Sequence, residues 1–323
     1  MSKPKVIVTR RWPAVVEERL KELFDVTLNE TDQPMSADQL REALRHYDCV
    51  MPTVTDPLPA EVLNVEPRRA RILGNFGVGF NHIDIQAAKS CGLTVTNTPD
   101  VLTDCTADIA MTLMLMVARR AGEGERHVRS GQWSGWRPTH MLGTKIVGKT
   151  LGMIGFGRIA RAMAKKAHHG FDMPILFFDP YPPADEVCRN LGAKACDSIE
   201  EVLKRSDFVA LHCPGSKENY HLLNAERLAL MKPGAYLINS ARGDVVDNDA
   251  LIAALRNRTI AGAGLDVFEG EPKLNPGFLP LENVVLLPHL GSATEETRIA
   301  MGMRVIENVS AFFNGEKPRD KVA

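Results

Sequence analysis

The sequence predicts an α/β protein built from two doubly wound lobes. Three observations support this fold class. The 323 residues suffice for two domains, short β-branched runs alternate with amphipathic stretches, and a glycine-rich turn joins a strand to a helix. Hydrophobic residues make up 44% of the chain and charged residues 24%, which is the composition of an ordinary folded protein. Disordered and collagen-like classes are therefore excluded.

The first lobe is predicted from the alternation of strands and helices. Residues 15–24 and 37–46 place apolar side chains three and four apart, as helices packed on a sheet do. Strand-like runs rich in β-branched and apolar residues lie around these helices, at residues 5–9, 25–28, 49–51, 71–73 and 93–97. Such βαβ units predict a parallel sheet.

A single long helix is expected next, from residue 102 to about residue 130. Its Met-rich face is interpreted as core or subunit packing, because Met fills irregular apolar gaps. Six further strands follow and suit a second doubly wound sheet, at residues 150–154, 174–178, 207–211, 235–239, 262–265 and 284–287. A last helix over residues 294–313 is expected to pack back on the first lobe. That lobe would then be discontinuous, with a small-molecule cleft between the lobes.

Charge and cysteine patterns narrow the classes of partner. With 39 basic and 40 acidic residues the net charge is −1, and no segment concentrates basic charge as nucleic-acid binding requires. The most apolar stretch, residues 109–118, is too short to cross a bilayer. The opening MSKPKVIVTR has no export signal, which favours the cytoplasm. Six cysteines without CxxC pairs or zinc-type spacing indicate reduced thiols and no metal.

A glycine-rich turn predicts a dinucleotide site. Gly155, Gly157 and Ala160 follow G-x-G-x-x-A spacing between a strand and a helix. The next strand ends at Asp179, about 20 residues on, where a carboxylate can bind ribose hydroxyls. That carboxylate would repel the extra phosphate of NADP, and the following PYPPAD offers no Arg or Lys, so NAD is the favoured cofactor and NADP the less favoured one. The alternative is a plain glycine turn.

Three polar segments at predicted strand ends suggest a reaction centre. NSARGD supplies Arg242, DVFEGEP supplies Glu271 and PHLGSAT supplies His289. Arg242 presents a fork of donors for a carboxylate or carbonyl, and a His titrates near neutrality. Singly, His289 reads as a core histidine and Glu271 as a solvated turn. Their joint appearance after successive strands favours proton-coupled hydride transfer.

These phrases, together with GKTLGMIGFGRIA, resemble the D-isomer-specific 2-hydroxyacid dehydrogenase family along nearly the whole chain, and most of all its glyoxylate and hydroxypyruvate reductase branch. The resemblance implies that Arg242 holds the carboxylate and carbonyl of a 2-oxo acid. It implies that His289 is the acid and base, and that Glu271 orients the His289 ring and favours its protonated form. It also implies that backbone N–H groups of Val78 and Gly79, in the loop NFGVGFN, bind the substrate carboxylate.

The resemblance extends to cofactor contacts and domain organisation. The implied cofactor-binding residues, besides Gly155, Gly157 and Asp179, are Phe156, Arg158, Ile159, Thr106, His212, Pro214, Ser240, Ala241, Asp266 and Gly291. A discontinuous, flavodoxin-like substrate domain would comprise residues 1–100 and 291–323, and a Rossmann NAD-binding domain residues 101–290. The helix over 102–130 would serve a homodimer.

Two alternatives remain open at this point. The first is a dehydrogenase for another 2-hydroxy acid, such as phosphoglycerate, lactate or a bulkier compound, with unchanged chemistry. The second is a non-enzymatic, NAD-responsive binding protein resembling the C-terminal-binding-protein co-repressors. A turnover assay would separate these readings.

Overall fold

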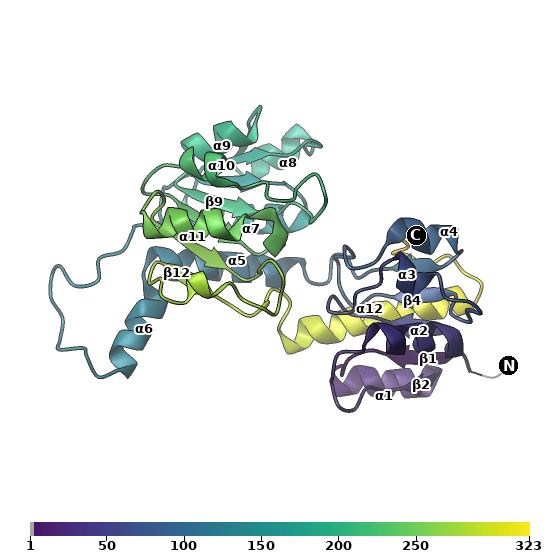
Figure 1. The fold of residues 1–323 in the computed structure, drawn as a ribbon. Coiled ribbons are helices and arrows are strands. Elements are labelled where there is room, and N and C mark those ends of the chain that lie inside the picture. The colour runs from purple at the N-terminus through teal and green to yellow at the C-terminus, as the bar shows by residue number, and fades with distance from the viewer. Residues whose placement is uncertain (1–2) are drawn as a thin grey trace. The chain divides into compact units, whose positions relative to one another are not determined.

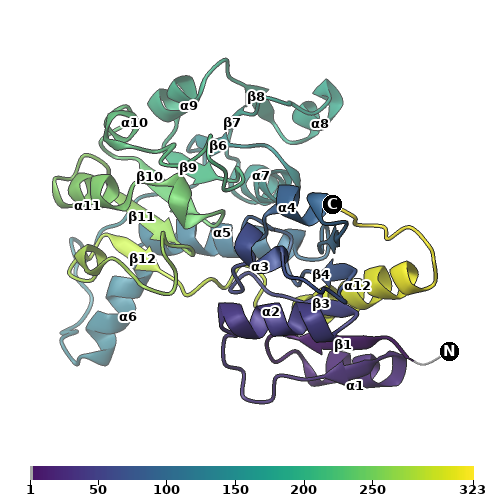
Figure 2. The same ribbon diagram turned by 45° about the vertical axis from the view of Figure 1, so that its right-hand side comes forward.

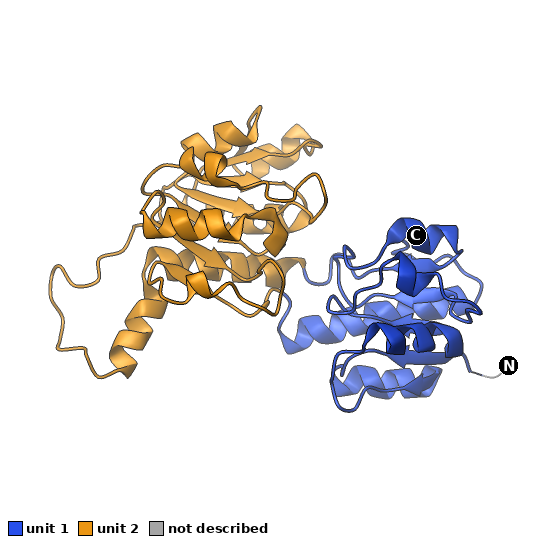
Figure 3. Cartoon of the chain, in the orientation of Figure 1, with its two compact units in different colours: residues 1–102, 292–323 blue, residues 103–291 orange. Residues whose placement is uncertain are grey.

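The computed structural model describes residues 3–323, which form two compact units (Figure 3). Unit 1 contains the residues up to Leu102 together with Ser292–Ala323, and unit 2 contains Thr103–Gly291. Both units carry a wholly parallel sheet with helices, so the α/β class is confirmed. No helix within residues 3–323 has the length and apolar content needed to cross a membrane.

Unit 1 is built on five strands in the order β2-β1-β3-β4-β5, the flavodoxin-like order. The strands are β1 (Lys5–Val8), β2 (Asp25–Thr27), β3 (Cys49–Met51), β4 (Ile72–Gly74) and β5 (Thr94–Thr96). The helices between them are α1 (Ala14–Leu23), α2 (Ala37–His46), α3 (Ala60–Leu63) and α4 (Ile85–Ser90). Because the central strands are buried on both faces, they consist of continuous apolar runs.

The last helix, α12 (Glu295–Phe313), belongs to unit 1 and packs on β4 and α1 (Figure 1). Glycines permit this close approach. A Cβ on Gly74 would lie 2.8 Å from Val305 Cγ1, and one on Gly302 would lie 2.6 Å from Val16 Cγ1. The chain then ends along β5, where Val322 N–H donates to the Val95 carbonyl (2.8 Å). The helix therefore returns to the first lobe, as its sequence predicts.

Unit 2 holds seven strands in the order β12-β11-β10-β9-β6-β7-β8, a Rossmann order with one added strand (Figure 2). The strands are β6 (Leu151–Ile154), β7 (Ile175–Phe178), β8 (Ala193–Ala195), β9 (Phe208–Leu211), β10 (Tyr236–Asn239), β11 (Gly262–Leu265) and β12 (Val284–Leu286). The α-helices that follow β6 in this unit are α7 (Arg158–Phe171), α8 (Asp185–Asn190), α9 (Ile199–Arg205), α10 (Ala225–Ala229) and α11 (Asn248–Arg256). Strand β8 is missing from the prediction because its three residues, two of them exposed, form no apolar run at the edge of the sheet.

The expectation of one long helix over residues 102–130 is wrong. The structure has α5 (Thr103–Ala118) and α6 (Ala121–Arg129), separated by Arg120 in the left-handed region at φ 52°. The Ala118 carbonyl accepts the Thr144 N–H (2.8 Å) from a crossing segment. That bond replaces helical continuation and ends α5. The interpretation of the Met-rich face holds for Met111 and Met114, which are buried in the core of unit 2.

Candidate active site

The glycine turn of unit 2 forms an open cradle at a helix N-terminus. Gly155 has φ 85°, and a Cβ there would lie 2.8 Å from the Cys213 nitrogen, so only glycine fits this turn. A Cβ on Gly157 would meet nothing within 4 Å, which means that the space before α7 is open. Gly157 caps α7 without a side-chain hydrogen bond. The first N–H groups of α7 are therefore available to an anion such as a pyrophosphate.

Asp179 lies directly beside this turn, as the spacing predicts. Its Oδ2 accepts the Phe156 N–H (2.6 Å) and its Oδ1 accepts the Tyr181 N–H (2.8 Å). The carboxylate therefore fixes the turn, and each oxygen keeps lone pairs for a ribose hydroxyl. The Phe156 ring stacks on Phe177 at 4.0 Å in the core, so only the backbone of Phe156 faces the cradle.

Several other implied cofactor residues gather near the strand ends. A Cβ on Gly291 would lie within 3.5 Å of both Thr106 and Asp266, so these three residues are in contact. The Ser240 hydroxyl, after β10, is buried and has no hydrogen-bond partner among residues 3–323. A buried orphan hydroxyl is what a polar cofactor group would satisfy. The residues present therefore fit a dinucleotide.

The remaining implied cofactor residues differ in what they contact. His212 directs Nε2 to the Met163 sulfur (3.3 Å), and burial lowers the pKa of His212 to about 4, so it is a neutral packing group behind the glycine turn. The Pro214 carbonyl accepts the Asn219 Nδ2 (2.9 Å). Arg158 and Ile159 open α7, and Ala241 N–H donates to Asn239 Oδ1 (3.1 Å).

His289 and Glu271 form a hydrogen-bonded pair. His289 Nδ1 lies 2.8 Å from Glu271 Oε2, while Glu271 Oε1 accepts the Phe268 N–H (2.9 Å). Burial alone would raise the pKa of Glu271. The hydrogen bonds from His289 and Phe268 together outweigh that effect, so the pKa of Glu271 lies below its ordinary value. The carboxylate is therefore ionised at neutral pH. It holds the imidazole through Nδ1 and leaves Nε2 to act on a substrate.

Asp266 fixes the backbone that carries His289. His289 has φ 55°, an uncommon conformation for a residue with a side chain. Asp266 accepts the N–H groups of Leu290 (2.7 Å) and Gly291 (2.8 Å), and its carbonyl accepts the His289 N–H (2.9 Å). Burial raises the pKa of Asp266 despite these bonds. This anchoring role was not predicted from the sequence.

Arg242 belongs to the same cluster through a tight contact between two loops. Asn239 Nδ2 donates to the Arg242 carbonyl (2.8 Å) and shapes the turn after β10. At Gly243 a Cβ would lie 1.9 Å from the Phe268 carbonyl carbon, so the Arg242 loop touches the Glu271 loop. Burial lowers the pKa of Arg242, whereas the charges of Glu271 and Asp244 raise it. The guanidinium is therefore partly desolvated and is influenced by the charge of Glu271.

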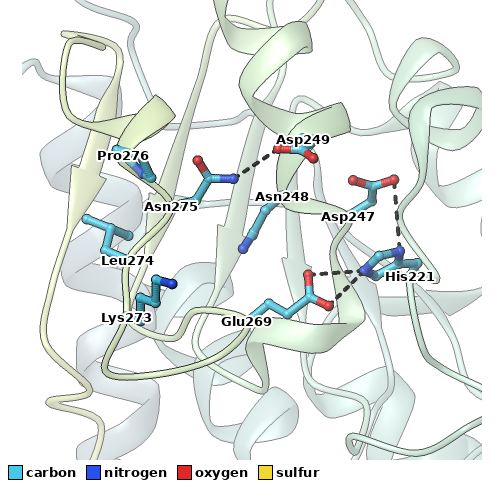
Figure 4. Close-up of a pocket in the computed structure, with 9 residues that line it drawn as sticks. All are labelled: His221, Asp247, Asn248, Asp249, Glu269, Lys273, Leu274, Asn275 and Pro276. Atoms are coloured by element: carbon cyan, nitrogen blue, oxygen red, sulfur yellow. Dashed lines mark hydrogen bonds and ion pairs between the residues drawn. The ribbon is translucent and has the colours of Figure 1, made fainter.

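A polar pocket lies beside the Glu271 loop and contains none of the predicted site residues. Figure 4 shows His221 between Glu269 and Asp247, with Nε2 3.1 Å from Glu269 Oε2 and Nδ1 3.9 Å from Asp247 Oδ2. His221 thus ties the segment after Arg242 to the segment before Glu271. This link could not be predicted from the sequence, because a single His after a Tyr belongs to no recognised motif.

In unit 1 the loop after β4 presents Val78 and Gly79, which are partly exposed, as the carboxylate-binding candidates. Among residues 3–323 their N–H groups have no acceptor, while the carbonyls of Gly77, Val78 and Gly79 are all hydrogen bonded. Asn75 and Asn97 make most of these bonds, and neither role was predicted from the sequence.

Comparison with known proteins decides the family. Residues 111–291 match the model "D-isomer specific 2-hydroxyacid dehydrogenase, NAD binding domain". The chain belongs to the D-isomer specific 2-hydroxyacid dehydrogenase family. As a member, it is an NAD(P)-dependent oxidoreductase that acts on CH–OH donors, and the resemblance drawn from the motifs is confirmed.

Three proteins similar to this dehydrogenase indicate the glyoxylate reductase branch of the family. A glyoxylate reductase of Thermococcus onnurineus is 46% identical over 320 residues, covering 98% of this chain and 95% of the relative. A glycerate dehydrogenase of Hyphomicrobium methylovorum is 38% identical and covers 98% of each chain. The structure of an NADPH-dependent glyoxylate/hydroxypyruvate reductase from Sinorhizobium meliloti, in complex with NADP and malonate, has a TM-score of 0.88 at 34% identity and covers 100% of this chain and 97% of that one.

Proposed function

We propose that this dehydrogenase reduces small 2-oxo acids, glyoxylate and hydroxypyruvate, to 2-hydroxy acids of D configuration where the product is chiral. The observation that carries the proposal is the His289–Glu271 pair, with Arg242 electrostatically coupled to Glu271. Relatives named glyoxylate reductase support the substrate class, with identities of 44–46%.

The residues divide the reaction between them. Bound NADH would supply a hydride to the carbonyl carbon of the 2-oxo acid. His289 Nε2 gives its proton to the carbonyl oxygen, which becomes the hydroxyl, and takes that proton back in the oxidation direction. Glu271 holds the ring through Nδ1 and balances the imidazolium charge. Arg242 grips the carbonyl and carboxylate, and the N–H groups of Val78 and Gly79 receive the carboxylate.

NADH is the proposed cofactor in preference to NADPH. Asp179 holds its negative charge next to the glycine turn, where the 2′-phosphate of NADPH would be repelled. The related Sinorhizobium enzyme is NADPH-dependent, so the ratio of the two rates is the informative quantity.

We further propose a cytoplasmic homodimer. Helix α6 and the segment after it project from unit 2 (Figure 1) and expose apolar side chains, namely Val128, Trp133, Trp136 and Leu142. A second copy would cover them. A monomeric mass in sedimentation at micromolar concentration would contradict the dimer. Fractionation of cells would test the cytoplasmic location, which rests on the opening residues having no export signal.

The test of function is turnover of NADH and NADPH against glyoxylate, hydroxypyruvate, pyruvate, phosphohydroxypyruvate and phenylpyruvate. The highest kcat/KM is expected for NADH with glyoxylate or hydroxypyruvate. Arg242→Lys should lower kcat/KM by about a hundredfold, since a point charge cannot replace a bidentate fork. NADH binding without turnover of any 2-oxo acid would instead support the binding-protein alternative.

A further inference from the structure

The carboxylate-binding loop of unit 1 is held by buried amides rather than by charges. Asn75 is fully buried, and its Nδ2 donates to the carbonyls of Gly77 and Gly79, at 3.0 Å each. His82 Nε2 lies 3.0 Å from Asn75 Oδ1. Because Asn75 Nδ2 faces two acceptors, Oδ1 is the acceptor toward His82 and the orientation of the amide is fixed.

The carbonyl between these two is held in the same direction. Asn97 Nδ2 donates to the Val78 carbonyl (2.8 Å), and the Thr98 N–H donates to the Gly77 carbonyl (3.1 Å). Three consecutive carbonyls, those of residues 77–79, are therefore engaged from the interior of unit 1.

The directions of these carbonyls determine the directions of the N–H groups that follow them in the chain. In a trans peptide the carbonyl of one residue and the N–H of the next point in opposite directions. When the carbonyls of Gly77, Val78 and Gly79 turn inward, the N–H groups of Val78, Gly79 and Phe80 turn outward. Consecutive N–H groups that face one way form an anion-binding concavity.

We propose that Asn75 is a positioning residue for the substrate carboxylate, acting through the loop it clamps, and that Phe80 N–H joins Val78 and Gly79 as a third donor. The inference rests on the proposed function, because it takes a 2-oxo acid carboxylate as the occupant of the loop. Asn97 has the same role at the central carbonyl. Neither side chain touches the substrate, so both act on binding and not on proton transfer.

The experiment separates binding from chemistry. Asn75→Ala removes the amide donor from the Gly77 and Gly79 carbonyls, and the Gly77 carbonyl keeps only the Thr98 N–H. KM for glyoxylate should rise by about tenfold to a hundredfold, the size expected when one or two hydrogen bonds to a charged group are lost. The value of kcat at saturating substrate and the dissociation constant of NADH should stay within about threefold, because the unit 2 residues are unchanged. A merely structural defect would lower all three together.

Control variants test the cause. Asn75→Asp keeps the shape but adds a negative charge, and Asn64→Asp adds the same charge at an exposed position of unit 1. We call the hydrogen bonds from Asn75 and Asn97 to the carbonyls of residues 77–79 the clamp. If the clamp positions the N–H groups, KM should rise in both Asn75 variants and stay unchanged in Asn64→Asp. A raised KM in Asn75→Asp alone would mean a charge effect and would overturn the proposal, as would an unchanged KM in folded Asn75→Ala.

A second variant and a second probe keep the two proposals distinct. If Asn75→Ala does not fold, Asn97→Ala should still raise KM by several-fold through the Val78 carbonyl, and an unchanged KM there would overturn the clamp. Calorimetric binding of oxalate in the presence of NADH measures the loop without turnover. If the wild-type protein turns over 2-oxo acids but Asn75→Ala binds oxalate as tightly as the wild type does, the clamp is contradicted and the proposed function is not. Absence of wild-type turnover would contradict the proposed function.

Discussion

The proposed site residues of the two units differ in chemical kind. Unit 1 offers backbone N–H groups fixed by the neutral amides of Asn75 and Asn97, whereas unit 2 offers the ionisable side chains of Arg242, Glu271 and His289. Backbone N–H groups do not titrate in the working range, so their affinity for an ionised carboxylate would not change with pH. The comparison indicates that the proposed carboxylate-binding N–H groups of unit 1 would add nothing to the pH dependence of the reaction, which would arise from the ionisable groups of unit 2.

The sheet of unit 2 explains how its ionisable groups meet. Strands β10, β11 and β12 are parallel neighbours, so their carboxyl ends lie at one edge. Arg242 follows β10, Glu271 lies on the loop after β11 and His289 follows β12. Ligands bind at such edges in open α/β sheets. Each residue is supplied by a different strand, and the loops between them fix the distances.

The largest effect is expected from His289→Ala. Removing the proton donor should lower kcat by about two to four orders of magnitude, because general acid catalysis contributes that much. The dissociation constant of NADH should not change, since the glycine turn is untouched. Steady-state kinetics and fluorescence titration with NADH measure the two quantities. His169→Ala, on the exposed end of α7, is the matched control. Lost NADH binding in a folded variant would contradict the separation of roles.

Gly243→Ala should have the next largest effect. A Cβ at this position would lie 1.9 Å from backbone atoms of Phe268, so the loops carrying Arg242 and Glu271 must separate. We expect kcat/KM to fall by more than about tenfold, since misplacement near 1 Å is costly in an active site. Kinetic assay with circular dichroism measures this. Gly234→Ala, where a Cβ meets nothing within 4 Å, should be neutral. Equal activity of the two variants would show that the loops yield freely.

Glu271→Gln tests the source of pH dependence. Glu271 has a lowered pKa, so its ionised pairing is present at neutral pH and is lost as pH falls through a value below the ordinary 4.5. Gln keeps the shape without the charge that balances the imidazolium. The rate of reduction should fall by about tenfold, and the pH above which that rate declines should move to a lower value. A rate profile from pH 5 to 9 measures this shift. An unmoved alkaline limb would locate the titrating group elsewhere.

The positions in the fold of the candidate residues of unit 2 could be predicted from the sequence more readily than the loop contacts of unit 1. The glycine turn, Asp179, Arg242, Glu271 and His289 each occupy a strand end that hydrophobic runs mark. The clamp around Val78 could not be predicted in the same way, because Asn75 and Asn97 act through backbone carbonyls. The direction of a backbone carbonyl cannot be inferred from the type of residue. The tight contact at Gly243 was missed because it joins residues 25 positions apart. The end of α5 depends likewise on a crossing segment that no local propensity encodes.

The smallest effect is expected behind the loop of unit 1, where Asn308 braces Asn97. Asn308 Nδ2 donates to Asp320 Oδ2 (3.0 Å) and to the Asn97 carbonyl (3.4 Å), and Asp320 N–H donates to Asn308 Oδ1 (3.1 Å). Asn308→Ala leaves buried groups unpaired, which should cost about 1–3 kcal/mol of folding free energy, measured by thermal or urea unfolding.

The kinetic consequence of Asn308→Ala should be far smaller than its effect on stability. Asn97 keeps its own bond to Val78, so KM for glyoxylate should rise by no more than about threefold, and the pH profile should not move. Asn314→Ala, at the exposed end of α12, is the control and should change neither quantity. A shifted pH profile in Asn308→Ala would contradict the proposed separation between a neutral binding loop in unit 1 and titrating side chains in unit 2.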